Sequence, residues 1–170
     1  VADEWETARF AASLVRVEYA AEPHVTDIYR QRDDAVALGA PPSPAEAPSF
    51  PPKPRGDAQK AFAAAAVRHQ GEYYVPIEHH NPMELYASTV IWDGGKLTVY
   101  DKTQGVQNVQ RYVCSVFGMT PDDVRVMSPF MGGGFGSGLR PQFQVVLAVL
   151  AARALERSVR LVLTRQQMYA

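Results

Sequence analysis

The sequence contains very little cysteine, since Cys114 is the only one among 170 residues. A single cysteine excludes an internal disulfide and any zinc or iron–sulfur site made from cysteines of this chain. Long apolar runs are also absent: the longest, 145–152, is far too short to cross a bilayer. The start of the chain carries no secretion signal. The sequence leaves the compartment, cytoplasmic or periplasmic, unassigned.

The chain has no excess of charge of either sign. It carries 17 basic and 18 acidic residues, for a net charge of −1. A protein that binds nucleic acid or a membrane surface through bulk electrostatics would carry a basic excess, so both classes are disfavoured. With 46% hydrophobic and 21% charged residues, the composition is that of an ordinary globular domain.

Proline is concentrated in one stretch. Seven of the 13 prolines lie between Pro41 and Pro54. Proline fixes φ and removes a hydrogen-bond donor, so this stretch is expected to be an extended linker, with boundaries at 41–56. It separates a short N-terminal piece from a larger body. The chain begins with Val1 and stops without a polar tail, so we expect a piece of a longer protein.

Periodicity and turn residues predict the elements on both sides of the linker. The N-terminal piece is expected to form a helix over 3–16 with Asp3 as its N-cap, although 14–19 alternates and is an alternative strand, and 24–39 is expected to be a loop. Asp57 caps a short helix over 57–66. The remaining body is expected to contain strands at 67–77, 85–92, 96–101, 124–127 and 159–164, and helices at 107–117 and 141–156. Asp93-Gly94-Gly95 predicts a hairpin turn. After its leading helix and strand, the body has the order ββαβαβ, which predicts an α+β fold with a mixed sheet and helices on one face.

The segment Met131-Gly132-Gly133-Gly134-Phe135-Gly136-Ser137-Gly138 gives the strongest local signal. Five glycines in seven positions, after a strand and before a helix, allow successive N–H groups to turn toward one anion. A flexible connector is the alternative. Ser137 excludes a dinucleotide fingerprint, and no Gly-Lys-Ser/Thr follows for a Walker loop. The Phe135 ring would pack under the loop or stack on a planar ligand.

Two histidines and a carboxylate lie together in His79-His80-Asn81-Pro82-Met83-Glu84. Such a group indicates a metal site, but adjacent residues of an extended chain point in opposite directions. Hydrogen bonding to nearby backbone is the favoured alternative, and a pocket-lining role lies between the two.

Three further residues have both a functional and a structural interpretation. Gln104 lies between a strand and a helix, where its amide could orient a ligand. Arg140 follows the glycine segment and is either a cation beside an anion site or a surface arginine. Cys114 is expected to be an inert core thiol.

Three of these motifs, in this order, resemble the molybdenum-binding subunit of the xanthine dehydrogenase and aldehyde oxidase family. They are Glu78-His79-His80-Asn81-Pro82-Met83-Glu84, Thr103-Gln104-Gly105 and Met131-Gly132-Gly133-Gly134-Phe135-Gly136. The resemblance runs from about Gly56 to Arg165. It implies that residues 1–40 are the tail of a preceding domain or an entry segment, and that 57–170 are the first part of the molybdenum cofactor-binding domain. The ββαβαβ order agrees with the unit that this family repeats.

The resemblance also implies roles for particular residues. Gln104 would lie beside molybdenum as the catalytic residue of this chain, Gly133, Gly134, Phe135 and Gly136 would line the cofactor, and Arg140 would line the substrate entrance. No carboxylate occurs at 137–140 to hold a purine, which favours oxidation of an aldehyde.

The rest of the implied enzyme lies outside this sequence. The cofactor would be molybdopterin, as its cytosine dinucleotide, and the partners would be a 2Fe–2S subunit and a FAD subunit. No residue of this chain is expected to ligate a metal, and the catalytic glutamate would lie downstream. The isolated piece is expected to be inactive and to hold no stable cofactor. Two alternatives stay open: a stand-alone phosphate- or nucleotide-binding module that uses the glycine segment, and a metal hydrolase that uses His79, His80 and Glu84.

Overall fold

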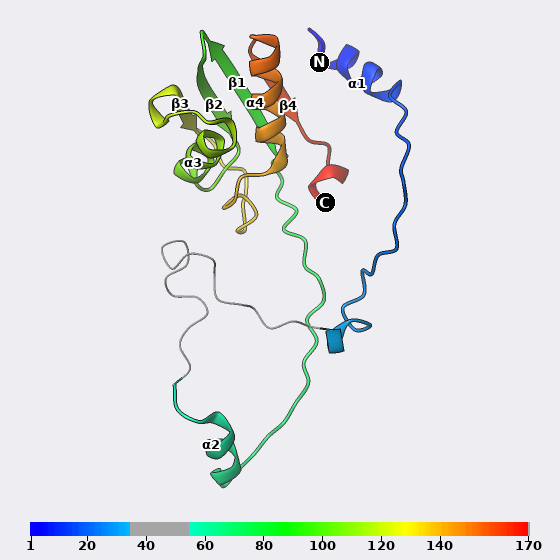
Figure 1. Ribbon diagram of the computed structural model, residues 1–170, viewed down its shortest axis with the longest axis vertical. Helices are drawn as coiled ribbons and strands as arrows, with labels where there is room; N and C mark the ends of the chain where they lie inside the picture. Colours follow the sequence, from blue (N-terminus) through cyan, green and yellow to red (C-terminus); the bar gives the residue numbers. More distant parts are fainter. Residues whose placement is uncertain (35–54, 170) are drawn as a thin grey trace. The chain divides into compact units, whose positions relative to one another are not determined.

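The computed structural model describes residues 1–34 and 55–169 (Figure 1). These residues fall into two compact units, Ala2–Tyr74 and the part from Val75 onward, to which Val1 is also assigned. The expected proline-rich linker at 41–56 lies outside the described residues, apart from Arg55 and Gly56.

The first unit contains two short helices, α1 (Trp5–Ser13) and α2 (Ala58–Ala64), neither of which has a buried residue. The helix expected at 3–16 is present in shortened form. Its N-cap is Glu4 rather than Asp3, and the alternative strand at 14–19 does not form. At α2 the cap prediction is confirmed, because the Asp57 carboxylate accepts a hydrogen bond from Lys60 N at 2.9 Å.

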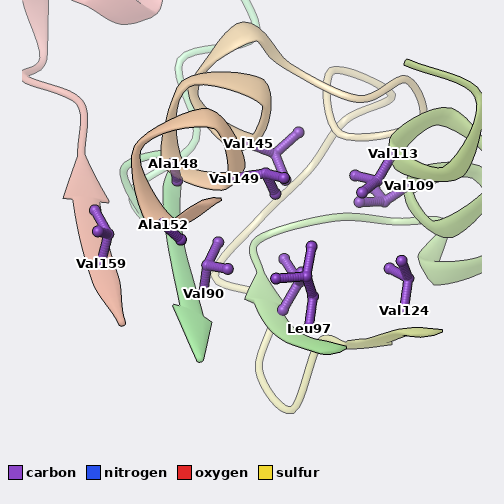
Figure 2. Packing of buried hydrophobic residues seen from close by; sticks show 11 residues of the cluster. Val90, Leu97, Val109, Val113, Val124, Val145, Ala148, Val149, Ala152 and Val159 are labelled. Atoms are coloured by element: carbon purple, nitrogen blue, oxygen red, sulfur yellow. The ribbon is translucent and has the colours of Figure 1, made fainter. Parts of the chain in front are cut away.

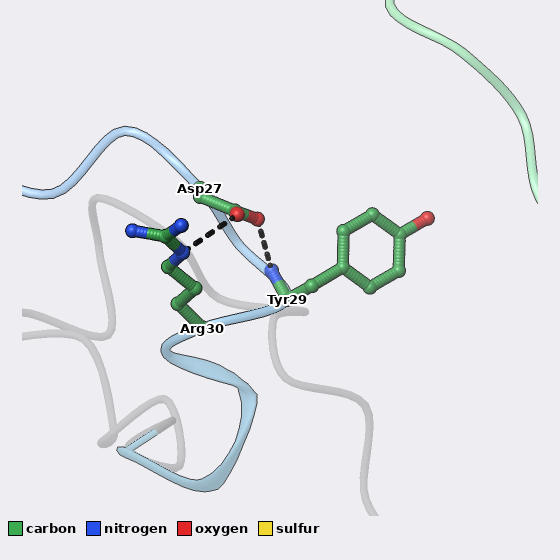
Figure 3. A network of polar contacts seen from close by, with 3 residues as sticks. All are labelled: Asp27, Tyr29 and Arg30. Atoms are coloured by element: carbon green, nitrogen blue, oxygen red, sulfur yellow. Dashed lines mark hydrogen bonds and ion pairs between the residues drawn. The ribbon is translucent and has the colours of Figure 1, made fainter.

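Between these helices, a turn of 3₁₀ helix (Arg32–Asp34) lies in the segment that was expected to be a loop. Just before this turn, Asp27 organises the backbone locally: its carboxylate accepts from Tyr29 N at 3.0 Å and lies 3.4 Å from Arg30 Nε (Figure 3). The strand expected at 67–77 is wrong, since the structure has no strand there. Its apolar residues are exposed, including Val67 at 89%, and no neighbouring strand pairs with it. Alternation alone does not make a strand without a partner.

The second unit is built on a four-stranded mixed sheet. Its strands are β1 (Ala87–Asp93), β2 (Lys96–Asp101), β3 (Val124–Met127) and β4 (Val159–Val162), in the order β3-β2-β1-β4. β1 is antiparallel to both β2 and β4, whereas β2 is parallel to β3. The expected ββαβαβ order and the α+β class are therefore confirmed.

The β1–β2 hairpin turns where the sequence indicates. Asp93 pairs with Lys96, which leaves Gly94 and Gly95 as a two-residue turn. Both have positive φ, +53° and +98°, and this conformation favours glycine.

Two helices, α3 (Val106–Phe117) and α4 (Phe143–Leu155), cover one face of the sheet (Figure 1). Apolar side chains from both helices and from all four strands meet in one layer between them (Figure 2). The core consists of Val90, Leu97, Val99, Val109, Val113, Val124, Val145, Ala148, Val149, Ala152 and Val159. No helix among the described residues is long and apolar enough to span a membrane.

The buried stripe of α3 is narrower than its periodicity indicates. Val109 and Val113 are fully buried, but Tyr112 and Val116 are nearly half exposed because α3 packs mainly against β3 at the edge of the sheet. The helix ends as expected at Gly118, which has a left-handed φ of +63°. α4 packs on β1 and β4, yet its outer side is also apolar, with Phe143, Leu147, Leu150 and Leu155 about half exposed.

Candidate functional site

The glycine loop, residues 131–138 between β3 and α4, is fixed at its start by Glu84. Glu84 N donates to Gly132 O at 3.1 Å, and Gly132 N donates to Glu84 Oε2 at 2.6 Å. A Cβ on Gly132 would lie 2.6 Å from the Cβ of Glu84, closer than real contacts allow. Close approach therefore requires glycine here, and the Glu84 carboxylate is engaged by the loop backbone.

Gln104 fixes the far end of the loop. Its backbone N donates to Gly138 O at 2.9 Å, and its side-chain Oε1 accepts from Gly136 N and Gly138 N, both at 3.1 Å. A Cβ on Gly134 would lie only 2.5 Å from the amide carbon and oxygen. Because both loop partners are N–H donors, the oxygen must face the loop. The Nε2 group has no hydrogen-bond partner among the described residues, and its two protons remain available to an acceptor.

Tyr86 and Ser137 hold the middle of the loop. The buried Tyr86 hydroxyl donates to Ser137 Oγ, which donates to Gly134 O at 2.7 Å. Ser137 N also donates to Gly134 O, at 2.9 Å, and this closes a tight turn. The sequence interpretation missed both residues. Ser137 lies inside the glycine motif, but the sequence alone does not indicate its contact with Tyr86.

Three consecutive N–H groups of the loop, those of Gly133, Gly134 and Phe135, have no acceptor among the residues that the structure describes. Gly133 has φ +92° and Phe135 has φ +55°. The Phe135 ring is 73% exposed, so the expectation that it packs beneath the loop is wrong. Stacking on a planar ligand, the other expectation for this ring, stays a prediction.

A buried polar cluster lies where β2 leads into Gln104. Asp101 Oδ1 accepts from Ser88 Oγ at 2.5 Å and from Gln144 Nε2 at 3.5 Å. Burial raises the pKa of Asp101, although Ser88, Gln144 and Lys102 oppose this. Burial lowers the pKa of Lys102, which the negative charges of Glu84 and Asp101 partly offset. Thr103 Oγ1 donates to Gly138 O at 3.0 Å, so this segment also touches the loop.

The two histidines lie beside the loop but form no metal site with Glu84. They line a cavity of about 210 Å³ that also includes Tyr86 and Ser137. The His79 ring meets the Tyr169 ring edge-on at 5.1 Å. In residues 1–34 and 55–169, no three His, Cys, Asp or Glu side chains lie together as metal ligands. The metal hydrolase alternative thus has no ligand set in this part of the chain.

Arg165 holds the histidine segment in place, a contact that the sequence interpretation missed. Its guanidinium donates to Asn81 Oδ1, to Pro82 O and to Met83 O at 2.6–2.8 Å. Nothing at position 165 distinguishes this arginine in the sequence, because the contact joins segments more than 80 residues apart. Arg140 is exposed at the end of the loop.

Other expected features lie away from the loop. Cys114 is partly buried against the core, and burial raises the pKa of its thiol. A larger hollow of about 360 Å³ between α3 and β3 is lined by none of the candidate residues. The predicted residues that the structure brings together are therefore Gln104 and the loop glycines.

Comparison with known proteins supports a family. Residues 44–170 match the family described as the molybdopterin cofactor-binding domain. The chain is 36% identical over 165 residues to the aldehyde oxidoreductase molybdenum-binding subunit PaoC of Escherichia coli strain K12, covering 97% of this chain and 21% of that protein. It is 31% identical to an aldehyde oxidoreductase of Megalodesulfovibrio gigas, covering 98% of this chain and 18% of that protein.

Solved structures agree in fold. Quinoline 2-oxidoreductase from Pseudomonas putida 86 aligns over 99% of this chain and 22% of its own, with a TM-score of 0.75 and 24% identity. Aldehyde oxidoreductase from Desulfovibrio gigas aligns over 66% of this chain and 12% of its own, with a TM-score of 0.60 and 31% identity. The chain spans about a fifth of the length of the curated relatives above. The family indicated by three short motifs is confirmed: this chain belongs to the molybdopterin cofactor-binding domain family.

Proposed function

We propose that this chain is part of the molybdenum-binding subunit of a molybdenum hydroxylase, an oxidoreductase of the xanthine dehydrogenase and aldehyde oxidase type. In this proposal the chain lines the molybdopterin site. One observation carries it: the Gln104 amide is locked by two loop N–H groups, so that Nε2 presents its protons at one fixed place.

The residues around the loop fit such a cofactor. Molybdopterin contains a planar pyrimidine ring in its pterin part and is rich in acceptor atoms. The loop offers three free N–H donors from Gly133, Gly134 and Phe135, together with Gln104 Nε2 and an exposed aromatic ring. Glycine at 132 and 134 lets the backbone pack closely on Glu84 and Gln104. The donors are therefore preorganised before any ligand arrives.

When bound, the cofactor would supply the oxidation of an aldehyde or heterocycle, with water as the oxygen source. The chain's own residues would bind the cofactor and orient it. Gln104 Nε2 donates to an acceptor atom, the Gly133–Phe135 N–H groups hold a second acceptor, and the Phe135 ring excludes water from one side. We place Arg140 at the substrate entrance as a permanent cation. Residues 137–140 contain no carboxylate, which supports an aldehyde rather than a purine as substrate.

The remaining parts of the enzyme are proposed from the same family. The chain covers a fifth of its relatives, which supports a catalytic glutamate outside these residues and an isolated chain that is inactive and holds no stable cofactor. We propose a molybdopterin cytosine dinucleotide, and partner subunits with a 2Fe–2S cluster and FAD. We also propose that 1–40 is an entry segment, 41–56 a linker and 57–170 the first part of the cofactor domain.

The test uses Gln104→Glu in the full-length subunit. Glutamate keeps an oxygen for the two loop N–H groups but replaces the free donor by an acceptor. Loss of one preorganised donor lowers turnover by about 10²-fold in other enzymes, so aldehyde turnover should fall by about that factor. Molybdenum per subunit is measured alongside, since assembly should be retained. Gln107→Ala, at an exposed glutamine of α3, is the matched control and should change neither quantity.

Equal turnover in the Gln104→Glu and Gln107→Ala enzymes would show that Gln104 does not act at the reacting centre. The three free N–H groups also fit a phosphate, which keeps a stand-alone nucleotide-binding module as the second candidate. Titration of the isolated chain with nucleotides distinguishes the two. Saturable binding without the molybdenum cofactor would favour the module.

A further inference from the structure

Lys102 is a buried cation without a hydrogen-bond partner. It follows β2 and stands two residues before Gln104, and only 4% of its surface is exposed. Its Nζ makes no hydrogen bond to any residue that the structure describes. An ammonium group in such a place lowers stability, because burial removes its water and no hydrogen bond among the described residues replaces it. The presence of a lysine at this buried position, despite the loss of stability, therefore needs a structural explanation.

The ammonium lies over an aromatic ring. Lys102 Nζ is 4.3 Å from the ring centroid of Tyr86, within cation–π range. Glu84 and Asp101 act on it electrostatically, but neither forms a salt bridge with it in the described parts of the chain. The ammonium group of Lys102 therefore contacts the face of the Tyr86 ring.

Tyr86 connects Lys102 to the glycine loop through hydrogen bonds. Its hydroxyl donates to Ser137 Oγ, and Ser137 Oγ donates to Gly134 O. The turn from Gly134 to Gly138 contains both N–H groups that hold Gln104 Oε1, those of Gly136 and Gly138. A tilt of the Tyr86 ring would move Ser137, and with it the turn that receives Gln104.

We propose that Lys102 is a positioning residue, whose ammonium fixes the ring of Tyr86 and thereby holds the Gly134–Gly138 turn in the shape that receives Gln104. The effect on the loop is a property of the polypeptide alone. Its importance for cofactor binding rests on the proposed function. A lysine that only fills space makes the opposite prediction, because a methionine of similar length would then serve as well or better.

The test is Lys102→Met in the full-length subunit, with two measurements. Hydrogen exchange is followed in the peptide that contains the hydrogen-bonded Gly136, Ser137 and Gly138 N–H groups, and it should become faster by roughly tenfold, as loss of a desolvated cation–π contact implies. The thermal midpoint should stay the same or rise, because the cost of burying the charge is gone. Lys96→Met, on the exposed start of β2, is the matched control and should leave both measurements unchanged.

Two further variants keep the proposal falsifiable if methionine disturbs folding. Lys102→Arg retains the cation and should keep loop exchange near the wild-type rate. Tyr86→Phe retains the ring but loses the hydroxyl, so it should accelerate hydrogen exchange in the same loop peptide. Adding Lys102→Met to Tyr86→Phe should then increase the exchange rate little further. The proposal would be overturned if the loop peptide of Lys102→Met exchanged at the wild-type rate. It would also be overturned if hydrogen exchange became faster to the same extent in β1 and β2. These measurements need no bound cofactor, so a failure here leaves the Gln104 test of function intact.

Discussion

Replacing Gly134 by alanine should push the Gln104 side chain out of the glycine loop. The added Cβ would lie 2.5 Å from both the amide carbon and Oε1 of Gln104. Gly134 itself has no positive φ, so alanine fits the backbone, and the three atoms nearest to the added Cβ all belong to Gln104. The variant therefore isolates the contact between the loop and Gln104.

The structure gives the size of the effect. Gln104 is exposed and can rotate into water, which relieves the overlap but breaks its two hydrogen bonds to Gly136 N and Gly138 N. Each neutral hydrogen bond contributes about 1 kcal/mol. The free energy of unfolding should therefore fall by about 2 kcal/mol.

A double-mutant cycle with Gln104→Ala measures this coupling by urea unfolding. In the Gln104→Ala background both hydrogen bonds are already lost, so Gly134→Ala should cost less than about 0.5 kcal/mol. Gly105→Ala is the control: the three atoms nearest to its added Cβ all belong to the exposed Asn108 side chain, at 2.9–3.5 Å, and none belongs to Gln104. Its cost should be the same in both backgrounds.

An equal cost of Gly134→Ala with and without the Gln104 side chain would refute the reasoning. The loop would then be sensitive to alanine for a reason other than this contact. The place of Gln104 in the proposed site would lose its structural basis, because the orientation of its Nε2 group depends on the same two hydrogen bonds.

Two further substitutions test the core and the buried polar cluster. Val149→Ala, in the centre of the core, should lower the free energy of unfolding by roughly 2 kcal/mol, whereas Val116→Ala, about half exposed, should cost under about 1 kcal/mol, as urea unfolding will measure. Burial raises the pKa of Asp101, so the folded state takes up a proton more readily than the unfolded chain. Relative to the Asp101→Asn variant, the wild-type protein should therefore be least stable at pH values above the raised pKa of Asp101. This difference should shrink as the pH falls through the raised pKa toward 3.8, the ordinary pKa of the carboxyl group. Thermal midpoints of both proteins across acidic pH will measure it. A gap between the two proteins that does not change with pH would contradict the second prediction.

Local chemistry accounts for the features that could be predicted from the sequence. Gly94, Gly95 and Gly118 take positive φ where glycine signals placed a turn and a helix end, and Asp57 caps the helix it precedes. The sheet and its two covering helices followed from period-2 and period-3.6 patterns. The strand expected at 67–77 failed because a pattern does not supply a partner strand.

The site residues also divide into those that local motifs predict and those that depend on contacts between distant segments. Gln104 and the loop glycines could be found because they form short motifs. Glu84–Gly132, Tyr86–Ser137 and the Lys102–Tyr86 contact could not, since each depends on which strand ends the sheet brings together. The first two pairs are separated by 48 and 51 residues in the chain. No local pattern encodes a partner at that distance.

The pairing of β1 with β4 also sets an order of events during synthesis. β1 acquires its hairpin partner β2 at once, but its other neighbour is the four-residue strand β4, which follows only after α3, β3 and α4, and in which Val159 pairs with Val90. Until that strand leaves the ribosome, one edge of β1 presents unpaired N–H and C=O groups, which recruit strands from other molecules. Contacts so distant in sequence form slowly. Nascent chains stalled before β4 should therefore depend most on chaperones, because β4 is the strand that covers this edge of β1.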